Sequence, residues 1–419
     1  MSSIKFLEKL LDGVAVEWTA LGEVAEVRSG WGFPNAYQGQ ANGDYPFYKV
    51  SDMNIAGNET MMVTANNYID AATVKRLGIK PAPEGTVIFP KIGAAVATNK
   101  KRLLSMPSAY DNNVMGLIPG EKVNSRFLYH WIQTINLCAL ANDSGAVPSI
   151  RKTEMEMLPV PIPCPDNHKK SLEIQAEIVR ILDSFTELTA ELTAELTARK
   201  KQYDYYRDQL LSFEDGEVEW KTVEEVFDLK NGYTPSKANA EYWTNGEVPW
   251  FRMEDIRTNG RILRAAIQRV SASAVKGKLI PPNSLIISTT ATIGEHALVE
   301  VPFLTNQQIT SFTLSKDYEK KVNVKFMFYY FFIFGRWCSE NSNKNGGMGI
   351  IGLSKLKQFE VPVPSLAEQA RIVAILDKFD ALTNSITEGL PREIELRQKQ
   401  YAYYRNLLLN FPKPEAAGA

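Results

Sequence analysis

The sequence has few of the residues that build disulfides, metal centres and nucleophilic sites. Its 419 residues include 3 cysteines and 3 histidines. They are Cys138, Cys164 and Cys338, and His130, His168 and His296. The cysteines are far apart and form no CxxC pair, and the histidines have neither metal-ligand spacing nor an obvious nucleophile beside them. The sequence therefore predicts no disulfide framework and no metal, and we expect no cofactor on this chain.

Two common enzyme motifs are also missing. No GxxxxGK[ST] phosphate loop occurs, because Gly277-Lys278 is followed by leucine and lacks the preceding glycine. No Asp-Pro-Pro-Tyr or Asn-Pro-Pro-Tyr tetrad of an amino-methyltransferase occurs either, since Pro281-Pro282 follows an isoleucine and precedes an asparagine. We therefore expect a non-catalytic protein.

Membrane and export signals are lacking as well. The longest apolar run, Phe326 to Phe334, is too short to cross a bilayer and predicts a buried helix or strand. The first 13 residues, MSSIKFLEKLLDG, have no apolar core of the signal-peptide kind. We expect a cytoplasmic protein without a membrane anchor.

Charge is nearly balanced over the chain but unevenly distributed. The formal net charge is −1. Residues 151–229 carry 10 Lys and Arg against 18 Asp and Glu, a net −8, whereas residues 230–345 carry 15 against 9, a net +6. Residues 22–150 carry 11 against 10. Nucleic acid is thus a possible partner of the globular parts, although no basic coat covers the whole chain.

Two long amphipathic stretches organise the chain. Between Ile174 and Phe213 apolar residues recur mostly in alternating steps of four and three, which predicts one helix with a single apolar stripe. About 40 residues at about 1.5 Å each give a rod of roughly 60 Å, or about 18 base pairs of DNA at about 3.4 Å each. Ile372 to Phe411 repeats the stripe. We expect the two rods to pair as an antiparallel coiled coil.

The two rods differ in their middle parts. The first contains Thr189-Ala190-Glu191-Leu192 followed by Thr193-Ala194-Glu195-Leu196, a four-residue repeat that predicts a stutter without a break. The second contains Gly389 and Pro391, which predict a kink or a break.

An internal repeat covers most of the chain. Val16-Glu17-Trp18 recurs as Val218-Glu219-Trp220, and Leu158–Pro163 corresponds to Phe359–Pro364. Leu10–Gly13 resembles the exit of the first rod, so the N-terminal segment looks like the end of a rod that begins near the C-terminus. We therefore predict an α+β fold in which two mixed α/β domains and two long helices form a tandem repeat with a pseudo-two-fold axis.

Within each globular half the repeat predicts strands at Gly85–Phe89 and Ser284–Ser288, and helices at Phe127–Leu140 and Lys325–Trp337. The proline-rich segments before the rods, Pro159–Pro165 and Pro362–Pro364, predict stiff passages that forbid an earlier helix start.

Polar and aromatic residues in predicted loops are candidates for DNA contact, because amide, basic and acidic side chains pair with base edges. In the first half they are Trp31, Asn35, Tyr37, Lys49, Ser51, Asp52, Lys91, Lys100, Lys101, Arg102, Asn112 and Asn113. In the second half they are Tyr233, Ser236, Arg252, Glu254, Asp255, Arg257, Thr289, Thr290, Asn306, Gln307 and Gln308. The same residue types also form ordinary loops and turns, so we favour those at matching positions of the repeat. These are Lys49–Asp52 against Arg252–Asp255, and Asn112-Asn113 against Asn306–Gln308.

Three features carry a family resemblance. They are the doubled Gln-Tyr-x-Tyr-Tyr-Arg block at Gln202–Arg207 and Gln400–Arg405, the doubled Ile-Val-x-Ile-Leu-Asp block at Ile178–Asp183 and Ile372–Asp377, and the Thr-Ala-Glu-Leu units. With two variable domains between near-identical helices, the chain resembles the specificity subunits of type I restriction–modification systems, and the Thr-Ala-Glu-Leu units resemble the type IC subgroup.

The resemblance implies a division of labour. Each variable domain would be a target recognition domain that reads half of a bipartite, asymmetric site in double-stranded DNA. The helices would dock two modification subunits, which bind S-adenosylmethionine and methylate, and restriction (motor–nuclease) subunits would join them. We expect an N-terminal segment completing the helical scaffold at 1–21, recognition domains at 22–165 and 214–365, long helices at 166–213 and 366–411, and a flexible tail at 412–419.

Two other functions stay open from sequence. In the first alternative the chain is a repeat scaffold that joins two protein partners and never touches DNA. In the second it is a recognition module of a single-chain methyltransferase–nuclease. A salt-dependent affinity for DNA would exclude the first, and methylation by the chain alone would indicate the second.

Overall fold

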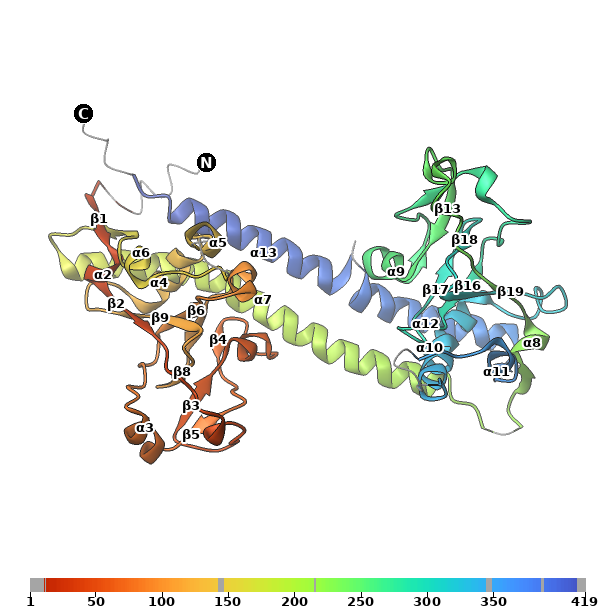
Figure 1. The fold of residues 1–419 in the computed structure, drawn as a ribbon, viewed down its shortest axis with the longest axis horizontal. Coiled ribbons are helices and arrows are strands. Elements are labelled where there is room, and N and C mark those ends of the chain that lie inside the picture. Colours follow the sequence, from red (N-terminus) through yellow and green to blue (C-terminus); the bar gives the residue numbers. More distant parts are fainter. Residues whose placement is uncertain are drawn as a thin grey trace. The chain divides into compact units, whose positions relative to one another are not determined.

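The computed structural model describes residues 11, 13–141, 147–214, 216–343, 349–385 and 388–412. The chain divides into two compact units, of which unit 1 comprises residues 1–189 and 397–419 and unit 2 comprises residues 190–396. The dividing points fall inside two helices, α7 (His168–Leu210) and α13 (Gly389–Leu408), so that each unit includes part of both. Figure 1 labels many of the helices and strands of each unit.

Unit 1 contains three small sheets. The five-stranded sheet has the order β2 (Ala25–Ser29), β9 (Val114–Pro119), β6 (Val87–Pro90), β7 (Arg102–Leu104), β4 (Met61–Met62). The three-stranded sheet has the order β5 (Tyr68–Ile69), β3 (Tyr45–Tyr48), β8 (Ala109–Tyr110), and a two-stranded ribbon joins β1 (Val16–Ala20) to β10 (Pro159–Pro163).

Unit 2 repeats this topology strand for strand. Its five-stranded sheet has the order β12 (Phe227–Asn231), β19 (Ile309–Leu314), β16 (Ser284–Ser288), β17 (His296–Val299), β14 (Ile262–Leu263). Its three-stranded sheet has the order β15 (Arg269–Val270), β13 (Val248–Phe251), β18 (Leu304–Thr305), and its ribbon joins β11 (Glu219–Thr222) to β20 (Glu360–Val363). The last pair of each five-stranded sheet is parallel and the others are antiparallel. The predicted α+β tandem repeat is confirmed.

Besides α7 and α13, each unit contains helices of different lengths. In unit 1 they are α2 (Leu21–Val24), α3 (Ala71–Leu77), α4 (Ser125–Ile132), α5 (Leu137–Leu140) and α6 (Lys152–Glu156), with 3-10 turns η1 (Asn35–Tyr37), η2 (Val50–Asn54) and η3 (Ala94–Thr98). In unit 2 they are α8 (Val223–Val226), α9 (Met253–Asn259), α10 (Val324–Glu340), α11 (Leu353–Lys357) and α12 (Leu366–Asn384), with η4 (Ala240–Trp243) and η5 (Ala272–Ala274).

Several predictions about these elements can be compared with the structure. The predicted strand 284–288 matches β16, and the apolar run beginning at Phe326 lies in the buried helix α10. The single helix predicted over 127–140 is wrong, because α4 ends at Ile132 and α5 begins at Leu137. Asn136 interrupts the helix, since its side-chain oxygen accepts a hydrogen bond from the amide of Cys138 and caps α5. Within the described residues no helix is long and apolar enough to cross a membrane.

Helix α7 is the first predicted rod. It spans 43 residues and continues unbroken through the Thr-Ala-Glu-Leu units. It begins after Pro165, which disfavours an earlier helix start. Asn167 caps its first turn, because the side-chain oxygen accepts a hydrogen bond from the amide of Lys170 at 3.0 Å.

The second rod is not one continuous helix, so the long helix predicted over 366–411 needs correction. Helix α12 ends at Asn384 and α13 begins at Gly389, where the kink or break was expected. Gly389 has φ +74°, and a Cβ there would lie 2.4 Å from the carbonyl oxygen of Ala381. Pro391 lies in the first turn of α13, where an amide hydrogen has no helical partner.

The proline-rich segments form strands, which the sequence reasoning missed. In β10 the even-numbered residues direct their amides toward β1, as the flanking bonds from Cys164 to Ala15 and from Leu21 to Leu158 indicate. The prolines occupy the odd positions, which face away from the partner strand, so they remove no hydrogen bond from the ribbon.

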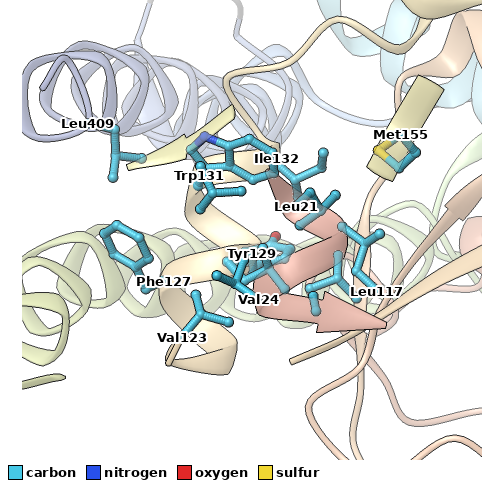
Figure 2. Close-up of a cluster of buried hydrophobic side chains, with 14 of the residues drawn as sticks. Leu21, Val24, Leu117, Val123, Phe127, Tyr129, Trp131, Ile132, Met155 and Leu409 are labelled. Carbon is cyan, nitrogen blue, oxygen red and sulfur yellow. The ribbon is translucent and has the colours of Figure 1, made fainter. Parts of the chain in front are cut away.

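Each unit has a core that joins its sheet to its helices. In unit 1, Leu117 of β9, Phe127 and Ile132 of α4 and Leu409 beyond α13 belong to one buried cluster (Figure 2). In unit 2 the corresponding cluster joins β16, β19 and α10 to Tyr203 of α7 and Ile372 of α12.

In both units a phenylalanine of one long helix stacks on a tyrosine of another, and α7 supplies the phenylalanine in unit 1 but the tyrosine in unit 2. In unit 1 Phe185 of α7 stacks on Tyr404 of α13 at a centroid distance of 5.0 Å. In unit 2 Tyr206 of α7 stacks on Phe379 of α12 at 5.7 Å. Trp18 in β1 donates a hydrogen bond to the carbonyl of Pro412, which brings the chain's two ends into one unit as the circular repeat predicted. Residues 1–10 of the predicted N-terminal segment and 413–419 of the predicted tail lie outside the described residues.

Candidate nucleic-acid interface

In unit 1 several strands end at one edge, and their loops are hydrogen-bonded to one another. After β2, the amide of Trp31 donates to the carbonyl of Tyr110 at 2.9 Å. After β8, the amide of Asp111 donates to the last carbonyl of β3 at 2.9 Å. After β6, the amide of Lys91 donates to the carbonyl of Asn113 at 2.9 Å. We call these residues, with Lys49, Ser51 and Asn112, the unit 1 loop edge.

Unit 2 builds the same edge. The amide of Tyr233 donates to the carbonyl of Thr305 at 2.8 Å, and that of Asn306 donates to the last carbonyl of β13 at 3.2 Å. The amide of Thr289 donates to the carbonyl of Gln308 at 2.9 Å. These residues, with Arg252, Thr290 and Gln307, form the unit 2 loop edge. The predicted candidates from distant segments are therefore brought together.

A glycine makes each edge possible. A Cβ on Gly30 would lie 2.0 Å from the carbonyl oxygen of Asp111, and one on Gly232 would lie 2.1 Å from that of Asn306. No side chain fits at either position, because the loops cross in direct backbone contact. In the sequence, Gly30 and Gly232 are separated by the same number of residues as Trp18 and Trp220 of the repeat, and this match thus reflects one shared crossing.

The accessible side chains differ between the edges. Among the candidates, Asn35, Ser51, Asn112, Asn113, Ser236, Glu254, Arg257 and Gln307 are exposed. Trp31, Tyr37, Lys49, Lys91, Lys100, Arg102, Tyr233, Arg252, Thr290 and Gln308 are partly exposed. Asp52, Lys101, Asp255, Thr289 and Asn306 are buried. One scaffold therefore presents two chemically different surfaces.

A cation lies over an aromatic ring at the same repeat position in both units. The Lys49 ammonium lies 5.5 Å from the centroid of Phe33 and donates to Gln38 at 2.6 Å. The Arg252 guanidinium lies 5.7 Å from Trp250 and pairs with Glu254 at 2.9 Å. These contacts hold each cation at the loop edge, and the Arg252 side chain keeps 30% exposure.

The two aspartates at matching positions do not face solvent. Asp52 accepts hydrogen bonds from the amide of Lys49 at 2.7 Å and from the side chain of Asn66 at 2.6 Å. Asp255 accepts from the amides of Arg252 at 2.8 Å and Ile267 at 2.6 Å. Both carboxylates cap η2 or α9 from inside, so the prediction that they contact bases needs correction. Their correspondence in the repeat reflects shared folding.

The candidates Lys100, Lys101 and Arg102 also form hydrogen bonds within unit 1. The Lys101 ammonium is buried and donates to Asn99 at 2.8 Å and to the carbonyl of Ile135 at 2.7 Å. Burial, aided by the charge of Arg405, lowers the pKa of Lys101 to about 8. Lys101 is therefore wrong as a DNA contact. Arg102 donates to the carbonyl of Lys101 at 2.9 Å, and Lys100 bonds to Asn54.

Tyr37, Ser236 and Arg257 lie outside the hydrogen-bonded core of each edge. The hydroxyl of Tyr37 accepts from Arg76 at 3.2 Å, and the carbonyl of Ser236 accepts from the ring nitrogen of Trp243 at 3.1 Å. Arg257 lies 4.0 Å from Glu295. Thr289 and Asn306 contribute backbone and buried side-chain bonds that shape the unit 2 loop edge.

A buried polar network anchors the recognition fold of unit 1 to its helices. His130 of α4 bonds to Asp183 of α7 and to Tyr401 of α13, both at 2.8 Å, and Arg126 pairs with Asp183 at 2.6 Å. Burial lowers the pKa of His130 despite the neighbouring carboxylate. Burial opposes ionisation of Asp183, but the bonds from His130 and Arg126 outweigh it and lower the pKa of this carboxyl.

Unit 2 has a different version of this network. Tyr329 of α10 donates to Asp377 at 2.6 Å, and Lys325 pairs with the same carboxylate at 2.7 Å. The two networks occupy equivalent positions, because the helices that carry them begin in the same way. Asn124 caps α4 by accepting a hydrogen bond from the amide of Arg126, and Asn323 caps α10 by accepting one from the amide of Lys325. Sequence reasoning found no role for His130, because its partners lie more than 50 residues away.

The described residues contain no group of three or more His, Cys, Asp and Glu arranged to hold a metal ion. Loops at the edge of a sheet are where the functional residues of a protein commonly lie. The class is that of DNA specificity proteins, and the chain belongs to the family described as "Type I restriction modification DNA specificity domain", which matches residues 15–199 and 216–396. It is the non-catalytic specificity subunit of a type I restriction–modification enzyme, and acts with other subunits and DNA.

Relatives support this assignment over the full length. The chain is 41% identical to the specificity subunit of the type I restriction enzyme EcoR124I/EcoR124II of Escherichia coli, with 99% of each chain covered. It is 33% identical to a putative type I restriction enzyme specificity subunit of Haemophilus influenzae, covering 97% of this chain and 98% of that one.

The fold is that of solved specificity subunits. A chain from a study of complex assembly and conformational transition of the type I restriction–modification system has a TM-score of 0.60 at 15% identity, covering 94% of this chain and 98% of that one. The type I restriction–modification S subunit of M. genitalium has a TM-score of 0.53 at 15% identity, covering 96% and 98%.

Proposed function

We propose that the chain reads a bipartite, asymmetric site in double-stranded DNA, one half-site with each loop edge. The observation that carries the proposal is the pair of glycine crossings at Gly30 and Gly232, which build one edge twice beneath different side chains. In this proposal residues 22–165 and 214–365 are the two target recognition domains.

Among the candidate side chains, those exposed at the loop edges are the proposed base readers. Asn112 and Asn113 suit adenine edges, Lys49 and Arg252 suit guanine, and Glu254 suits the cytosine amine. In unit 2 Gln307 takes the place of Asn112 and Gln308 takes that of Asn113, and both suit adenine as well.

The helices provide the docking surface for partners. Tyr205 and Tyr403 occupy the same place in the doubled block and are 62% and 59% exposed. Each packs edge-on against the next tyrosine, which is held by a stacked phenylalanine of the other helix. Because the surface occurs twice, it suits two copies of one partner, which we identify as two modification subunits that bind S-adenosylmethionine. Restriction (motor–nuclease) subunits join this core in the cytoplasm.

A domain exchange tests the proposal. Residues 22–157 are replaced by the equivalent segment of another family member, and methylated adenines are mapped by long-read sequencing in cells that express the whole system. The expected result is a new first half-site with the second half-site unchanged. A change in both half-sites, or in neither, would contradict the assignment of one half-site to each unit.

Two measurements on purified protein distinguish the proposed function from the two alternatives, the first on the chain in complex with modification subunits and the second on the chain alone. Affinity for random duplex DNA that falls as salt rises excludes a scaffold that joins proteins without touching DNA, because phosphate contacts release counterions. Absence of methylation when the chain alone receives DNA and S-adenosylmethionine excludes a module with its own methyltransferase activity.

A further inference from the structure

Three exposed lysines of unit 2 gather beside its loop edge. Lys230 is in β12, and Lys276 and Lys278 are in the segment between η5 and β16. The Lys230 ammonium donates a hydrogen bond to the carbonyl of Lys278 at 2.9 Å, which joins the two segments. We call these three residues the unit 2 lysine patch.

Tyr233 connects the patch to the loop edge. Its hydroxyl accepts a hydrogen bond from the amide of Lys276 at 2.7 Å and donates one to the carbonyl of Ala274 at 3.0 Å. The Lys276 ammonium lies 5.6 Å from the centre of the tyrosine ring. The amide of Tyr233 in turn bonds to Thr305, directly before the predicted base readers. The patch and the base readers therefore flank one residue.

The charge of the patch is not neutralised. Among the described residues, no carboxylate forms an ion pair with Lys230, Lys276 or Lys278. The patch also lies in the segment with a net charge of +6. Three unpaired ammonium groups on one exposed surface favour a polyanionic ligand.

Unit 1 handles the equivalent position differently. There Arg28 of β2 donates to the carbonyl of Lys80 at 3.3 Å, as Lys230 does to that of Lys278. The Nε and Nη2 atoms of Arg28 donate to the two carboxylate oxygens of Glu26, at 2.8 and 2.7 Å. Unit 1 therefore keeps the geometry and cancels the arginine charge within its own sheet.

We propose that the unit 2 lysine patch binds backbone phosphates of the DNA next to the half-site that unit 2 reads, and that unit 1 has no equal anchor. The inference rests on the proposed function. Phosphate contacts add affinity without sequence information, so unit 2 supplies the larger share of the sequence-independent affinity of the chain.

A matched pair of triple variants tests the proposal in the complex with modification subunits. The test variant is Lys230→Gln, Lys276→Gln and Lys278→Gln. The control is Lys316→Gln, Lys320→Gln and Lys321→Gln, which removes three exposed charges from the turn after β19, at the opposite end of the β12–β19 pair. Both variants have the same net charge. The affinity for a duplex with the methylated site is measured from about 50 to about 200 mM salt.

The test variant is expected to reduce the slope of log affinity against log salt by about 2 to 3, since each phosphate contact contributes about 0.9. The control is expected to change it by less than about 1, and the methylated sequence is expected to stay the same in both. The charge-preserving change of the three lysines to arginine should retain the wild-type slope, which separates loss of charge from misfolding.

Equal slopes for the test variant and the control would overturn the proposal while leaving the proposed function intact. A changed methylation motif in the test variant would also overturn it, since it would assign base reading to the patch. If the wild-type complex showed no salt-dependent binding at all, the proposed function itself would fail.

Discussion

Replacing Gly30 by alanine places a methyl group where the loop edge of unit 1 has no room. The added Cβ would lie 2.0 Å from the carbonyl oxygen of Asp111, about 1.4 Å short of the 3.4 Å at which ordinary van der Waals contact begins. The backbone conformation is not the obstacle, because φ at Gly30 is not positive. The clash is with backbone, and no side chain can rotate away to relieve it.

The loss of stability depends on the backbone that the added methyl group displaces, which is that of Tyr110 and Asp111. The amide of Asp111 donates a hydrogen bond to the carbonyl of Tyr48, and the neighbouring carbonyl of Tyr110 accepts one from the amide of Trp31, both at 2.9 Å. Retreat of this peptide breaks or lengthens both hydrogen bonds and displaces Asn113. We expect a loss of about 1–3 kcal/mol of stability, the usual range for overpacking.

Hydrogen exchange of the assembled complex is the assay. Gly30→Ala should speed exchange of the amides in 109–119 and leave those in 304–314 unchanged, and it should weaken or alter methylation at the first half-site alone. Gly32→Ala is the control, because a Cβ there meets nothing within 4 Å. Gly232→Ala should have the mirror effect on the second half-site. Equal exchange and equal methylation for Gly30→Ala and Gly32→Ala would refute the role of the crossing.

Three further predictions concern the helices and the buried histidines. Tyr205→Ala and Tyr403→Ala should each weaken the binding of one modification subunit by about 2 kcal/mol, or about 30-fold. The melting temperature should change little, because both rings are largely exposed. Unchanged stoichiometry and affinity by mass photometry would contradict this. Insertion of one Thr-Ala-Glu-Leu unit after Leu196 adds about 6 Å to α7 and should lengthen the unread spacer by one to two base pairs; altered half-site bases with an unchanged gap in the methylation map would be the opposite result. Burial lowers the pKa of His130, and that of His296 to about 3, so both bind a proton less readily in the folded chain than in the unfolded chain, where the pKa is about 6.5. Their stabilisation is thus present above pH 6.5 and lost as pH falls, by at most about 1.4 kcal/mol per pH unit and histidine. His130→Gln should flatten the fall in the free energy of unfolding between pH 6.5 and 5.5 relative to the wild type. An equal fall for variant and wild type, measured by urea denaturation at each pH, would contradict this.

The long helix and the tandem repeat could be predicted because their signals are local or self-similar. The apolar stripe in α7 needs only neighbouring residues, and the position of the break before Gly389 follows from glycine and proline chemistry. The ribbon strands could not be predicted in the same way. Proline normally argues against a strand, and only pairing with β1 shows that its missing amide faces outward.

The candidate site was predictable as a region and less so residue by residue. Repeat positions located the loop edges, but the same comparison selected Asp52 and Asp255, whose carboxylates turn inward to cap backbone amides. Lys101 looked like its neighbour Lys100, yet its ammonium is buried. The lysine patch was missed because Lys230 and Lys278 meet only through the fold. The net positive charge of residues 230–345 was its single signal.

The prolines of β10 have a consequence for the interior that surrounds the ribbon. Pro161 and Pro163 are buried, so the edge of β10 that faces away from β1 is covered by the unit itself. An amide hydrogen at either position would point away from β1 into a buried environment, where an unpaired donor costs about 1–3 kcal/mol. Proline removes that donor, and replacing Pro161 by valine would bury an amide that has no partner in the ribbon.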